Sequence, residues 1–320
     1  VYFANTLDTF QQDLQRARPT LFFSVPRLWM KFYLGVNAKL PPKKQKLLFS
    51  LPLVSSMVKK KVLRQLGLDH CRAALTGAAP LSEEIITWYR SLGLELLEVY
   101  GMTENFGYSH ASRPGQARIG FVGVTNPGVE HRIGEGGELQ VKSPGMMLGY
   151  YQNEEKTRED VTADGFLKTG DMGEINADGY LRITGRVKDL FKTSKGKYVV
   201  PVPIENRFNH PAVEVVCVAG ANQPQPCLML LLSEEIRAAL TTGMSRDELE
   251  QELANELKAV NETCEAHEKI AFVVAVKEPW TMENGMLTPT MKIKRNVIED
   301  VYNRKMDDWF EQKKKVIWEF

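Results

Sequence analysis

The stretch LLEVYGMTENFGYSH, residues 96–110, constrains the fold more than any other part of this sequence. It begins with an apolar run that is typical of a buried strand, and the run breaks at Gly101. In open α/β sheets, ligands bind beyond the carboxyl ends of the strands, so a site is expected at this break. Tyr100 can stack on a base, Thr103 can donate to a phosphate oxygen, and Glu104 can bind Mg²⁺. The alternative is a strand that is followed by an ordinary polar turn.

The sequence before this stretch alternates strand patterns with helix patterns. LFFSV (21–25) is typical of a short buried strand, and Pro41-Pro42 opens a long basic helical region with a break expected at Pro52. Residues 71–93 run from a strand through a turn of small residues into a helix, for which Ser82 is the expected N-cap. This alternation predicts a largely parallel α/β sheet.

The pattern changes after residue 110, where Gly and Pro separate short alternating segments. NADG (176–179) is typical of a hairpin turn, with Gly at the position that favours positive φ. We therefore predict a β-rich subdomain of antiparallel strands over about 111–186. From residue 203 the pattern is α+β. The predicted fold class is α/β and α+β, with residues 1–186 in a large domain and 187–320 in a small C-terminal domain.

Length and composition agree with two domains of an ordinary globular protein, because the 320 residues are 43% hydrophobic and 25% charged. The 41 Lys and Arg residues almost balance the 40 Asp and Glu residues, so no global field favours a nucleic-acid partner. Local basic clusters occur at 43–46, 58–64 and 313–315. We interpret them as solvated helix faces, and the alternative is docking on an anionic membrane surface.

The cysteines are scattered and form no CxxC pair, which argues against a metal cluster or a disulfide framework. This pattern fits a reducing cytosol, so a cytoplasmic protein is expected. No apolar run approaches the roughly 18 residues of a membrane span. The chain starts at Val1 without a methionine or a signal-like segment, and we interpret it as part of a longer protein.

Four further segments carry side chains with specific chemistry. TGAAPL (76–81) places small residues between a strand and a helix, which allows a flat ring to approach the backbone. Asp171 follows a glycine turn and suits a vicinal diol, and Arg186 offers a second diol or phosphate partner. Lys292 follows a Thr-Pro-Thr loop. Taken singly, each has an ordinary alternative, namely a turn aspartate or a solvated cation.

Taken in order, these segments resemble the later motifs of the acyl-adenylate-forming enzymes. The matching segments are TGAAPLS, YGMTE, GELQVKSPGMMLGYY, FLKTGD, GRVKDLFKTSKGKYVVPVPIE and LTPTMKIKR. The similarity is strongest to the long-chain fatty acid–CoA ligases. It implies the rear part of a large adenylate-forming domain followed by a small mobile domain. It also implies a two-step reaction, in which a fatty acid and ATP give acyl-AMP and pyrophosphate, and CoA then gives acyl-CoA and AMP. The sequence leaves peripheral membrane contact and oligomerisation open.

The resemblance also assigns roles to individual residues. The residues implied to bind the nucleotide are Gly77, Ala78, Ala79, Tyr100, Gly101, Thr103, Asp171, Ile183 and Arg186. Within this set, Tyr100 is implied to stack on adenine, Thr103 to contact phosphate, and Asp171 and Arg186 to bind the ribose hydroxyls. Glu104 is implied to hold Mg²⁺, and Lys292 to bridge the substrate carboxylate and the α-phosphate.

The implied domain movement depends on two further places. Lys188 is the implied hinge, about which the small domain rotates between the two half-reactions. The loop with Lys195, Gly196 and Lys197 is implied to replace Lys292 at the site when CoA reacts.

The sequence departs from the family pattern in three respects. Met291 stands where many members have Gly, and Lys195 stands where the long-chain branch often has Gly. The Gly/Ser/Thr-rich phosphate loop of the family is absent from these 320 residues, so we expect this chain alone to be inactive or nearly so. Two alternatives stay open: a CoA ligase for a medium-chain, aryl or amino acid, or a truncated chain with a non-catalytic role.

Overall fold

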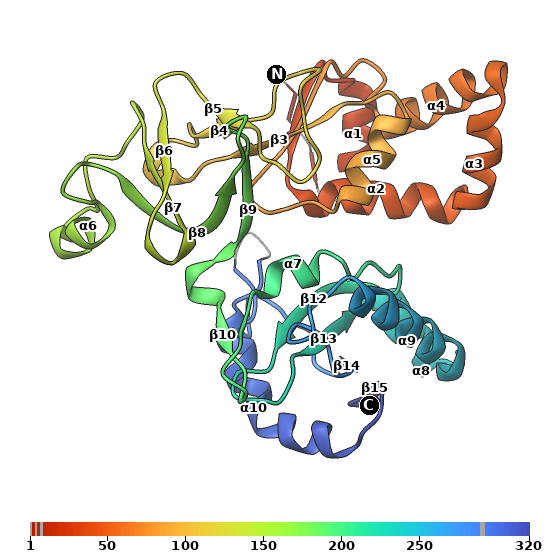
Figure 1. The fold of residues 1–320 in the computed structure, drawn as a ribbon. Helices are drawn as coiled ribbons and strands as arrows, with labels where there is room; N and C mark the ends of the chain where they lie inside the picture. Colours follow the sequence, from red (N-terminus) through yellow and green to blue (C-terminus); the bar gives the residue numbers. More distant parts are fainter. Residues whose placement is uncertain (1, 4, 7–8, 289–291) are drawn as a thin grey trace. The chain divides into compact units, whose positions relative to one another are not determined.

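The structure is a computed structural model that describes residues 2–3, 5–6, 9–288 and 292–320. The chain divides into two compact units, Val1–Ile183 and Thr184–Phe320 (Figure 1). The division falls inside strand β9 (Leu181–Arg186), and the boundary expected between residues 186 and 187 lies at the end of the same strand. Each unit is described separately below.

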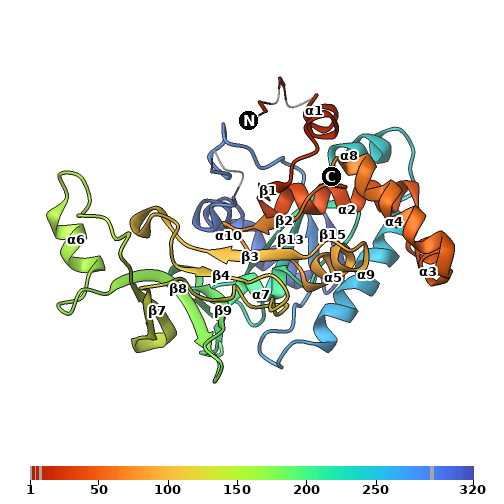
Figure 2. The ribbon, with the colours of Figure 1, turned by 90° about the horizontal axis from the view of Figure 1, so that it is seen from above.

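The first unit is built on a five-stranded sheet in the order β1-β2-β3-β4-β5, in which β3 lies between β2 and β4 (Figure 2). Strands β1 to β3 are parallel, and β4 and β5 pair antiparallel with their neighbours. The parallel part confirms the fold class predicted from the alternating pattern. The strands are β1 (Leu21–Ser24), β2 (Ala73–Thr76), β3 (Leu96–Tyr100), β4 (His110–Ala111) and β5 (Val124–Thr125).

Five helices of the described residues accompany this sheet: α1 (Phe10–Ala17), α2 (Pro26–Lys39), α3 (Pro42–Ser50), α4 (Pro52–Leu66) and α5 (Glu83–Ser91). The break expected at Pro52 is confirmed, because this proline starts α4 directly after α3 ends. Ser82 caps α5, and its hydroxyl accepts a hydrogen bond from the Ile85 N–H at 3.4 Å. The core joins α2 to α5 through Trp29 and Tyr89, whose rings meet edge to face at 5.0 Å.

An antiparallel sheet in the order β6-β7-β8-β9 forms the predicted β-rich part. Its strands and helix are β6 (Glu130–Ile133), β7 (Glu138–Lys142), α6 (Glu154–Asp160), β8 (Leu167–Ile175) and β9. Leu139, Val141, Leu167 and Leu181 of strands β7, β8 and β9 are buried and form a small core. Gly179, at φ +80°, donates its N–H to Asn176 O at 2.9 Å in the predicted hairpin turn.

The second unit contains the four-stranded sheet β12-β13-β14-β15, with one antiparallel pair and two parallel pairs. Its side chains alternate between two cores, so that Leu249, Leu253 and Leu257 of α9 pack on one face. Ile298 and Tyr302 of α10 belong to the core of the other face. The elements are β10 (Phe191–Lys192), β11 (Tyr198–Val199), α7 (Pro201–Glu205), β12 (Val213–Ala219), β13 (Cys227–Leu232), α8 (Glu234–Thr241), α9 (Arg246–Glu262), β14 (Val273–Ala275), α10 (Arg295–Glu311) and β15 (Val316–Trp318).

Glu98, in the middle of β3, makes the stability of the first unit depend on pH. Burial, with a smaller contribution from nearby Glu83, raises the pKa of this carboxyl to about 8. The folded chain therefore binds a proton at Glu98 that the unfolded chain, with a pKa near 4.5, releases between about pH 4.5 and 8. The free energy of unfolding should fall by about 1.4 kcal/mol per pH unit within this window.

Glu98→Gln imitates the protonated carboxyl, so it should remove most of this pH dependence. The measurement is urea unfolding at pH 5 and pH 8, with Glu174→Gln as an exposed control on β8. Equal pH dependence of the wild type and Glu98→Gln would show that Glu98 is ionised in the folded chain.

Candidate functional site

The parallel pairing of β2 with β3 places two of the predicted segments at one edge of the sheet. Thr76 lies opposite Glu98 in register, so the turn that begins at Gly77 and the break after Tyr100 follow neighbouring carboxyl ends. Gly77 is required by this close pairing, because a Cβ atom there would lie 2.9 Å from Val99 Cγ2 and 3.0 Å from Val99 O. The small residue was predicted to admit a ligand, whereas the structure gives it a role in strand packing as well.

The next residue, Ala78, adopts the left-handed backbone conformation at φ +71°. This region is unfavourable for residues with a Cβ atom, and such residues concentrate at binding sites and active sites. Ala78 and Ala79 thus form a small, strained turn directly beyond β2. Such a turn exposes backbone groups without a bulky side chain in front of them.

The break after β3 is a tight turn closed by two glycines. A Cβ atom on Gly101 would lie 2.5 Å from the carbonyl carbon of Gly107, so only glycine fits at the start of the turn. The Gly107 N–H donates to Met102 O at 2.8 Å and closes it. Thr103 and Glu104 lie in the short 3₁₀ helix at its tip, with Thr103 exposed and Glu104 half-buried. The turn therefore presents the predicted hydroxyl and carboxylate to solvent.

Tyr100 and Asp171 meet although 71 residues separate them in the sequence. The Tyr100 hydroxyl donates a hydrogen bond to Asp171 Oδ2 at 2.7 Å, which joins the end of β3 to β8. A hydrogen bond to a carboxylate is stronger than one between neutral groups, so it holds both side chains in a defined place. Two residues with predicted nucleotide roles are thereby brought together within the first unit.

The backbone of β8 is irregular where Asp171 occurs. The register between β7 and β8 shifts between Glu138 and Gln140, as in a β-bulge, and Gly170 adopts φ +70°. The Thr169 hydroxyl donates to Leu139 O at 2.8 Å and accepts from the Asp171 N–H at 3.1 Å. Bulges redirect side chains, and this one sets the direction of the Asp171 carboxylate.

Glu104 has a fixed partner in Tyr150. The Tyr150 hydroxyl lies 3.1 Å from Glu104 Oε1 and 3.0 Å from Asp160 Oδ2, and its single proton can be donated to either carboxylate. Burial, followed by these two carboxylates, raises the pKa of Tyr150. Sequence reasoning did not identify Tyr150, although it lies in a segment that carried the family resemblance.

Glu104 suits Mg²⁺ better than a metal ion that is bound by three or four protein side chains. The described part of the chain contains no group of three or more His, Cys, Asp or Glu residues placed to hold a metal. Mg²⁺ is commonly bound by one or two carboxylates, several waters and the phosphates of a substrate. A half-buried Glu104 supplies one such carboxylate.

Two histidines that were not identified from the sequence lie near Tyr100. They are His110, which faces Tyr100, and His131, which contacts His110. His110 lies opposite Tyr100 in the β3–β4 pairing, and their rings are 6.0 Å apart. His110 Nε2 lies 2.8 Å from His131 Nδ1, and His110 Nδ1 lies 2.9 Å from Ser109 Oγ. Burial, with a smaller contribution from His131, lowers the pKa of His110 to about 3. The ring beside Tyr100 is therefore uncharged at neutral pH.

In the second unit, Lys292 is exposed and is hydrogen-bonded to Thr288. Its N–H donates to Thr288 Oγ1 at 3.0 Å, and the Thr288 N–H donates to Lys292 O at 2.8 Å. Leu287 and Ile293 form an antiparallel bridge beside this pair. Met291 and the two residues before it lie outside the described residues, so the departure noted at Met291 has no structural description.

The loop with Lys292 is anchored by a buried ion pair three residues later. Arg295 is only 7% exposed, and its guanidinium donates to Glu205 Oε1 at 2.7 Å and Oε2 at 3.0 Å. It also donates to Val218 O at 2.6 Å, and its Nε lies 3.9 Å from Asp189 Oδ2. This one side chain therefore connects the start of α10 with α7, β12 and the residue after Lys188.

Sequence periodicity contained a signal for Arg295 that was not used. It lies in line with Ile298, Tyr302, Met306 and Trp309, which are the buried positions of α10. A cation on the apolar stripe of a helix requires a buried anionic partner, because an unpaired buried charge is very unfavourable.

The segment predicted to act on CoA is a short hairpin between β10 and β11. The Thr193 N–H donates to Lys197 O at 2.9 Å, and Gly196 adopts φ +76° in the turn. Lys195 and Lys197 are both exposed. The hairpin thus presents two cations at its tip.

The structure brings some predicted site residues together and leaves others in separate units. Ile183 packs on the same small core as Tyr100 in the first unit. Arg186, exposed Lys188 and Lys292 belong to the second unit. The predicted roles of these residues stay predictions.

Comparisons with known proteins define the class. The AMP-binding enzyme model matches residues 1–151, and the AMP-binding enzyme C-terminal domain model matches residues 188–314. The adenylation domain of carboxylic acid reductase from Segniliparus rugosus has the same fold, with a TM-score of 0.77 at 24% identity over 97% of this chain and 50% of that chain. The chain belongs to the AMP-binding enzyme family, which confirms the resemblance.

Two relatives are long-chain fatty acid–CoA ligases. The chain is 35% identical over 269 residues to FadD15 from Mycobacterium bovis, which covers 78% of this chain and 44% of that protein. It is 28% identical over 362 residues to ACSBG2 from Gallus gallus, which covers 94% of this chain and 47% of that protein. The chain thus spans about half the length of the curated relatives it matches.

Among the residues that the structure describes, no helix has the length and apolar character needed to cross a bilayer.

The Arg295–Glu205 pair makes a testable prediction for the second unit. Arg295→Met leaves the buried carboxylate of Glu205 without its cation, so the free energy of unfolding should fall by about 3–5 kcal/mol. The double variant Glu205→Gln/Arg295→Met should recover much of this loss, because it removes the buried carboxylate of Glu205 together with its cation. The amide oxygen introduced by Glu205→Gln can still accept from the Val218 N–H, which donates to the carboxylate in the wild type. Urea unfolding measures both effects.

Arg304→Met on the exposed face of α10 is the matched control and should change stability little. A single variant within about 1 kcal/mol of the wild type, or losses that simply add in the double variant, would contradict a coupled buried pair.

Proposed function

We propose that the protein is a long-chain fatty acid–CoA ligase that activates a fatty acid with ATP and transfers the acyl group to CoA. The single observation that carries the proposal is the Tyr100–Asp171 hydrogen bond beside the turn of Gly77 and Ala78. It supports a pocket with a flat ring, a diol-binding carboxylate and accessible backbone at one edge of the sheet. Adenosine is the ligand with a base and a ribose that suits such a pocket.

In the first half-reaction, a carboxylate oxygen of the fatty acid attacks the α-phosphorus of ATP, and pyrophosphate leaves. Asp171 would accept hydrogen bonds from the ribose hydroxyls, and Arg186 would provide the second contact. Thr103 would donate to phosphate, and Gly77, Ala78, Ala79 and Gly101 would line the pocket by their backbone. Mg²⁺ held by Glu104 would neutralise phosphate charge.

Lys292 would reduce the repulsion between the attacking carboxylate and the α-phosphate. A positioned cation of this kind typically contributes about 10²–10³ in rate. The buried Arg295–Glu205 pair supports this role, because it fixes the chain shortly after the lysine. In the second half-reaction, the CoA sulfur attacks the acyl carbonyl carbon, the thiol loses its proton, and AMP leaves.

The hairpin of Lys195, Gly196 and Lys197 would face CoA in this second step, after rotation about Lys188. Asp189 lies 3.9 Å from Arg295, so the residue after the hinge is held by the core of the second unit. This arrangement supports a pivot that is short and well defined.

Several finer assignments belong to the same proposal. The four cysteines are free thiols, which supports a cytoplasmic location. We also propose peripheral contact with the inner face of a membrane, because the fatty-acid substrate is an amphiphile and partitions into membranes.

Formation of palmitoyl-CoA from palmitate, ATP and CoA by the full-length protein tests the proposal, with medium-chain, aryl and amino acids as competitors.

Asp171→Asn should raise KM for ATP and weaken AMP binding about 10- to 100-fold, since it loses a charged hydrogen bond of roughly 1.5–3 kcal/mol. Asp178→Asn, at a surface turn, is the control and should change neither value. Preference for another acid, or normal ATP use by Asp171→Asn, would refute the assignment.

The hinge gives a prediction that separates the two half-reactions. Lys188→Pro fixes φ at the pivot, so palmitoyl-AMP formation should stay near the wild-type rate while thioester formation slows at least tenfold. Pyrophosphate release and palmitoyl-CoA formation are measured separately in single turnovers. Equal loss in both steps would show that Lys188 is not a hinge.

A further inference from the structure

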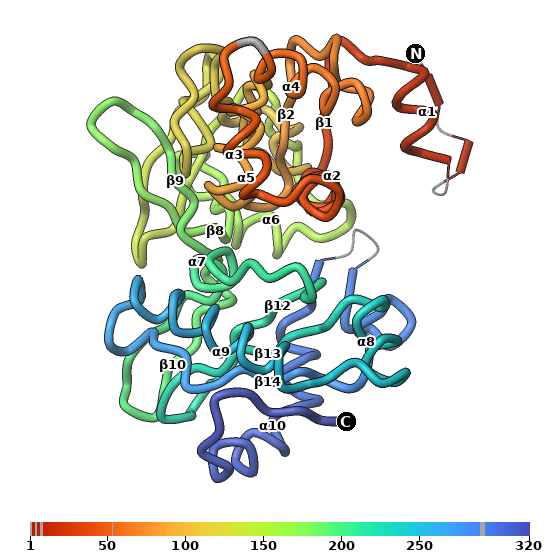
Figure 3. The backbone as a smooth tube through the Cα atoms, turned by 90° about the vertical axis from the view of Figure 1, so that its right-hand side faces the viewer, coloured from red at the N-terminus to blue at the C-terminus, as the bar shows by residue number. Residues whose placement is uncertain are grey.

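The first unit contains a long segment with charge of one sign. Residues 14–68 contain twelve Lys and Arg residues and no Asp or Glu, although the whole chain has 41 basic and 40 acidic residues. Seven of the twelve belong to α3 and α4, which lie next to each other (Figure 3). Such a segregation of charge produces a local positive field that the near-neutral total conceals.

Helix α4 has one buried face and one outward face. Val62 and Leu66 are buried in the core of the first unit. The outward face carries Met57, Lys60, Lys61 and Arg64 at spacings of three and four residues, and all four are exposed. Among the described residues, Lys60, Lys61 and Arg64 form no ion pair, so no carboxylate neutralises this face.

Large apolar side chains lie beside these cations. Met57 is 72% exposed and Leu47, on α3, is 64% exposed, and Leu51 and Val54 between them are also exposed. Exposed apolar residues grouped with cations are typical of helices that lie in the interface of an anionic membrane. We call Leu47, Leu51, Val54, Met57, Lys60, Lys61 and Arg64 the basic face.

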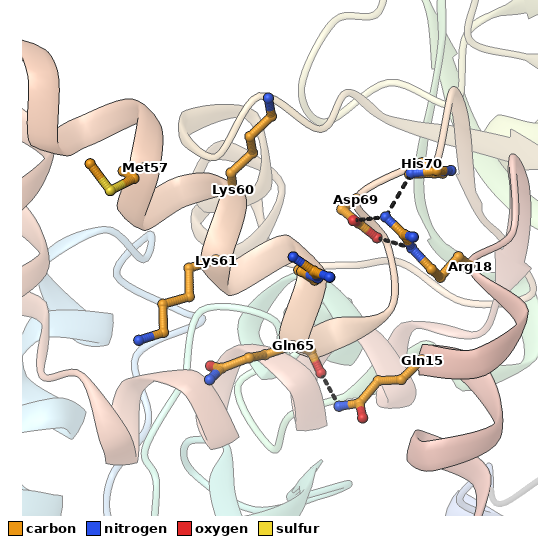
Figure 4. Close-up of a pocket in the computed structure, with 9 residues that line it drawn as sticks. Gln15, Arg18, Met57, Lys60, Lys61, Gln65, Asp69 and His70 are labelled. Atoms are coloured by element: carbon orange, nitrogen blue, oxygen red, sulfur yellow. Dashed lines mark hydrogen bonds and ion pairs between the residues drawn. The ribbon is translucent and has the colours of Figure 1, made fainter.

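A cavity of about 920 Å³ adjoins the basic face and is lined by Lys60, Lys61 and Arg64 together with Arg18 and His70 (Figure 4). Asp69 is the acidic residue of the lining, and Arg18 binds it through two nitrogen atoms. None of the residues assigned to the nucleotide lines this cavity. Lys60 and Lys61 point in different directions (Figure 4), so the cations are spread around this hollow, at a place separate from the proposed adenylate pocket.

We propose that the basic face docks the protein on bilayers that contain anionic phospholipids, with lipid phosphates in the adjoining cavity. Each cation near such a surface contributes about 1 kcal/mol, and inserted apolar side chains add a contribution that salt does not screen. The apolar residues favour a membrane over a nucleic acid, which would gain little from them. This inference deepens the membrane contact that the proposed function includes, because it names the surface and the lipid class. It is argued from charge and exposure and not from the ligase activity, so binding to vesicles and ligase activity can fail separately.

The test is sedimentation of the 320-residue chain with vesicles of phosphatidylcholine that contain about 30% phosphatidylglycerol. The chain should bind these vesicles and not vesicles of phosphatidylcholine alone. Lys60→Gln/Lys61→Gln/Arg64→Gln should weaken binding about 100-fold at low salt, since each charge is worth about fivefold. Lys258→Gln/Lys313→Gln/Lys314→Gln removes the same charge from exposed positions of the second unit and should bind as the wild type does.

Leu47→Ser/Met57→Ser keeps every charge and should weaken vesicle binding at least tenfold, with little effect on binding to duplex DNA. Inorganic phosphate at millimolar concentration should not displace the vesicles. Equal losses from the two triple variants, or unchanged binding by the serine variant, would overturn the proposal. So would tighter binding to DNA than to vesicles, or vesicle binding by the full-length protein that the first triple variant leaves intact.

Discussion

The hydrogen bond between Tyr100 and Asp171 is the interaction on which the proposed site depends, because it joins two sheets of the first unit at 2.7 Å. It needs irregular backbone on both sides. On β8, the shift in register and the positive φ of Gly170 turn the carboxylate. On β3, Gly101 permits a turn so tight that a Cβ atom would meet the Gly107 backbone at 2.5 Å. A Cβ atom on Gly77 would also lie too close to its neighbours, at 2.9 Å from Val99 Cγ2, so both turns at this edge of the sheet require glycine.

Cations serve two opposite purposes in this chain. Arg295 is buried and donates hydrogen bonds to both carboxylate oxygens of Glu205. It also lies 3.9 Å from Asp189, so it holds the start of α10, just after Lys292, close to Asp189. Lys60, Lys61 and Arg64 on α4 are exposed and form no ion pair among the described residues, so their positive field can attract an external anion. The total charge of the chain does not distinguish these two kinds of cation. The burial of each side chain and its ion-pair partners distinguish them.

The sequence was sufficient for local structure and for the family. Prolines located the α3–α4 break and Ser82 located the start of α5, because each depends on near neighbours in the chain. The apolar run at 21–25 located strand β1, but the prediction that this strand is buried was wrong, since Leu21 and Phe23 are exposed. Spacing alone could not place Tyr100 beside Asp171, since 71 residues intervene and only the order of family motifs linked them. Tyr150 and His110 were missed because a polar side chain in a β-rich segment carries no periodic signal. Arg295 could have been found from the buried stripe of α10.

An experimental structure of the protein with AMP would test the proposed adenylate site directly. We expect adenine against Tyr100 and the turn of Gly77 and Ala78, with ribose hydroxyls within about 3 Å of an Asp171 oxygen. AMP bound elsewhere in the first unit, or bound with its ribose away from Asp171, would show that these residues do not form the nucleotide site.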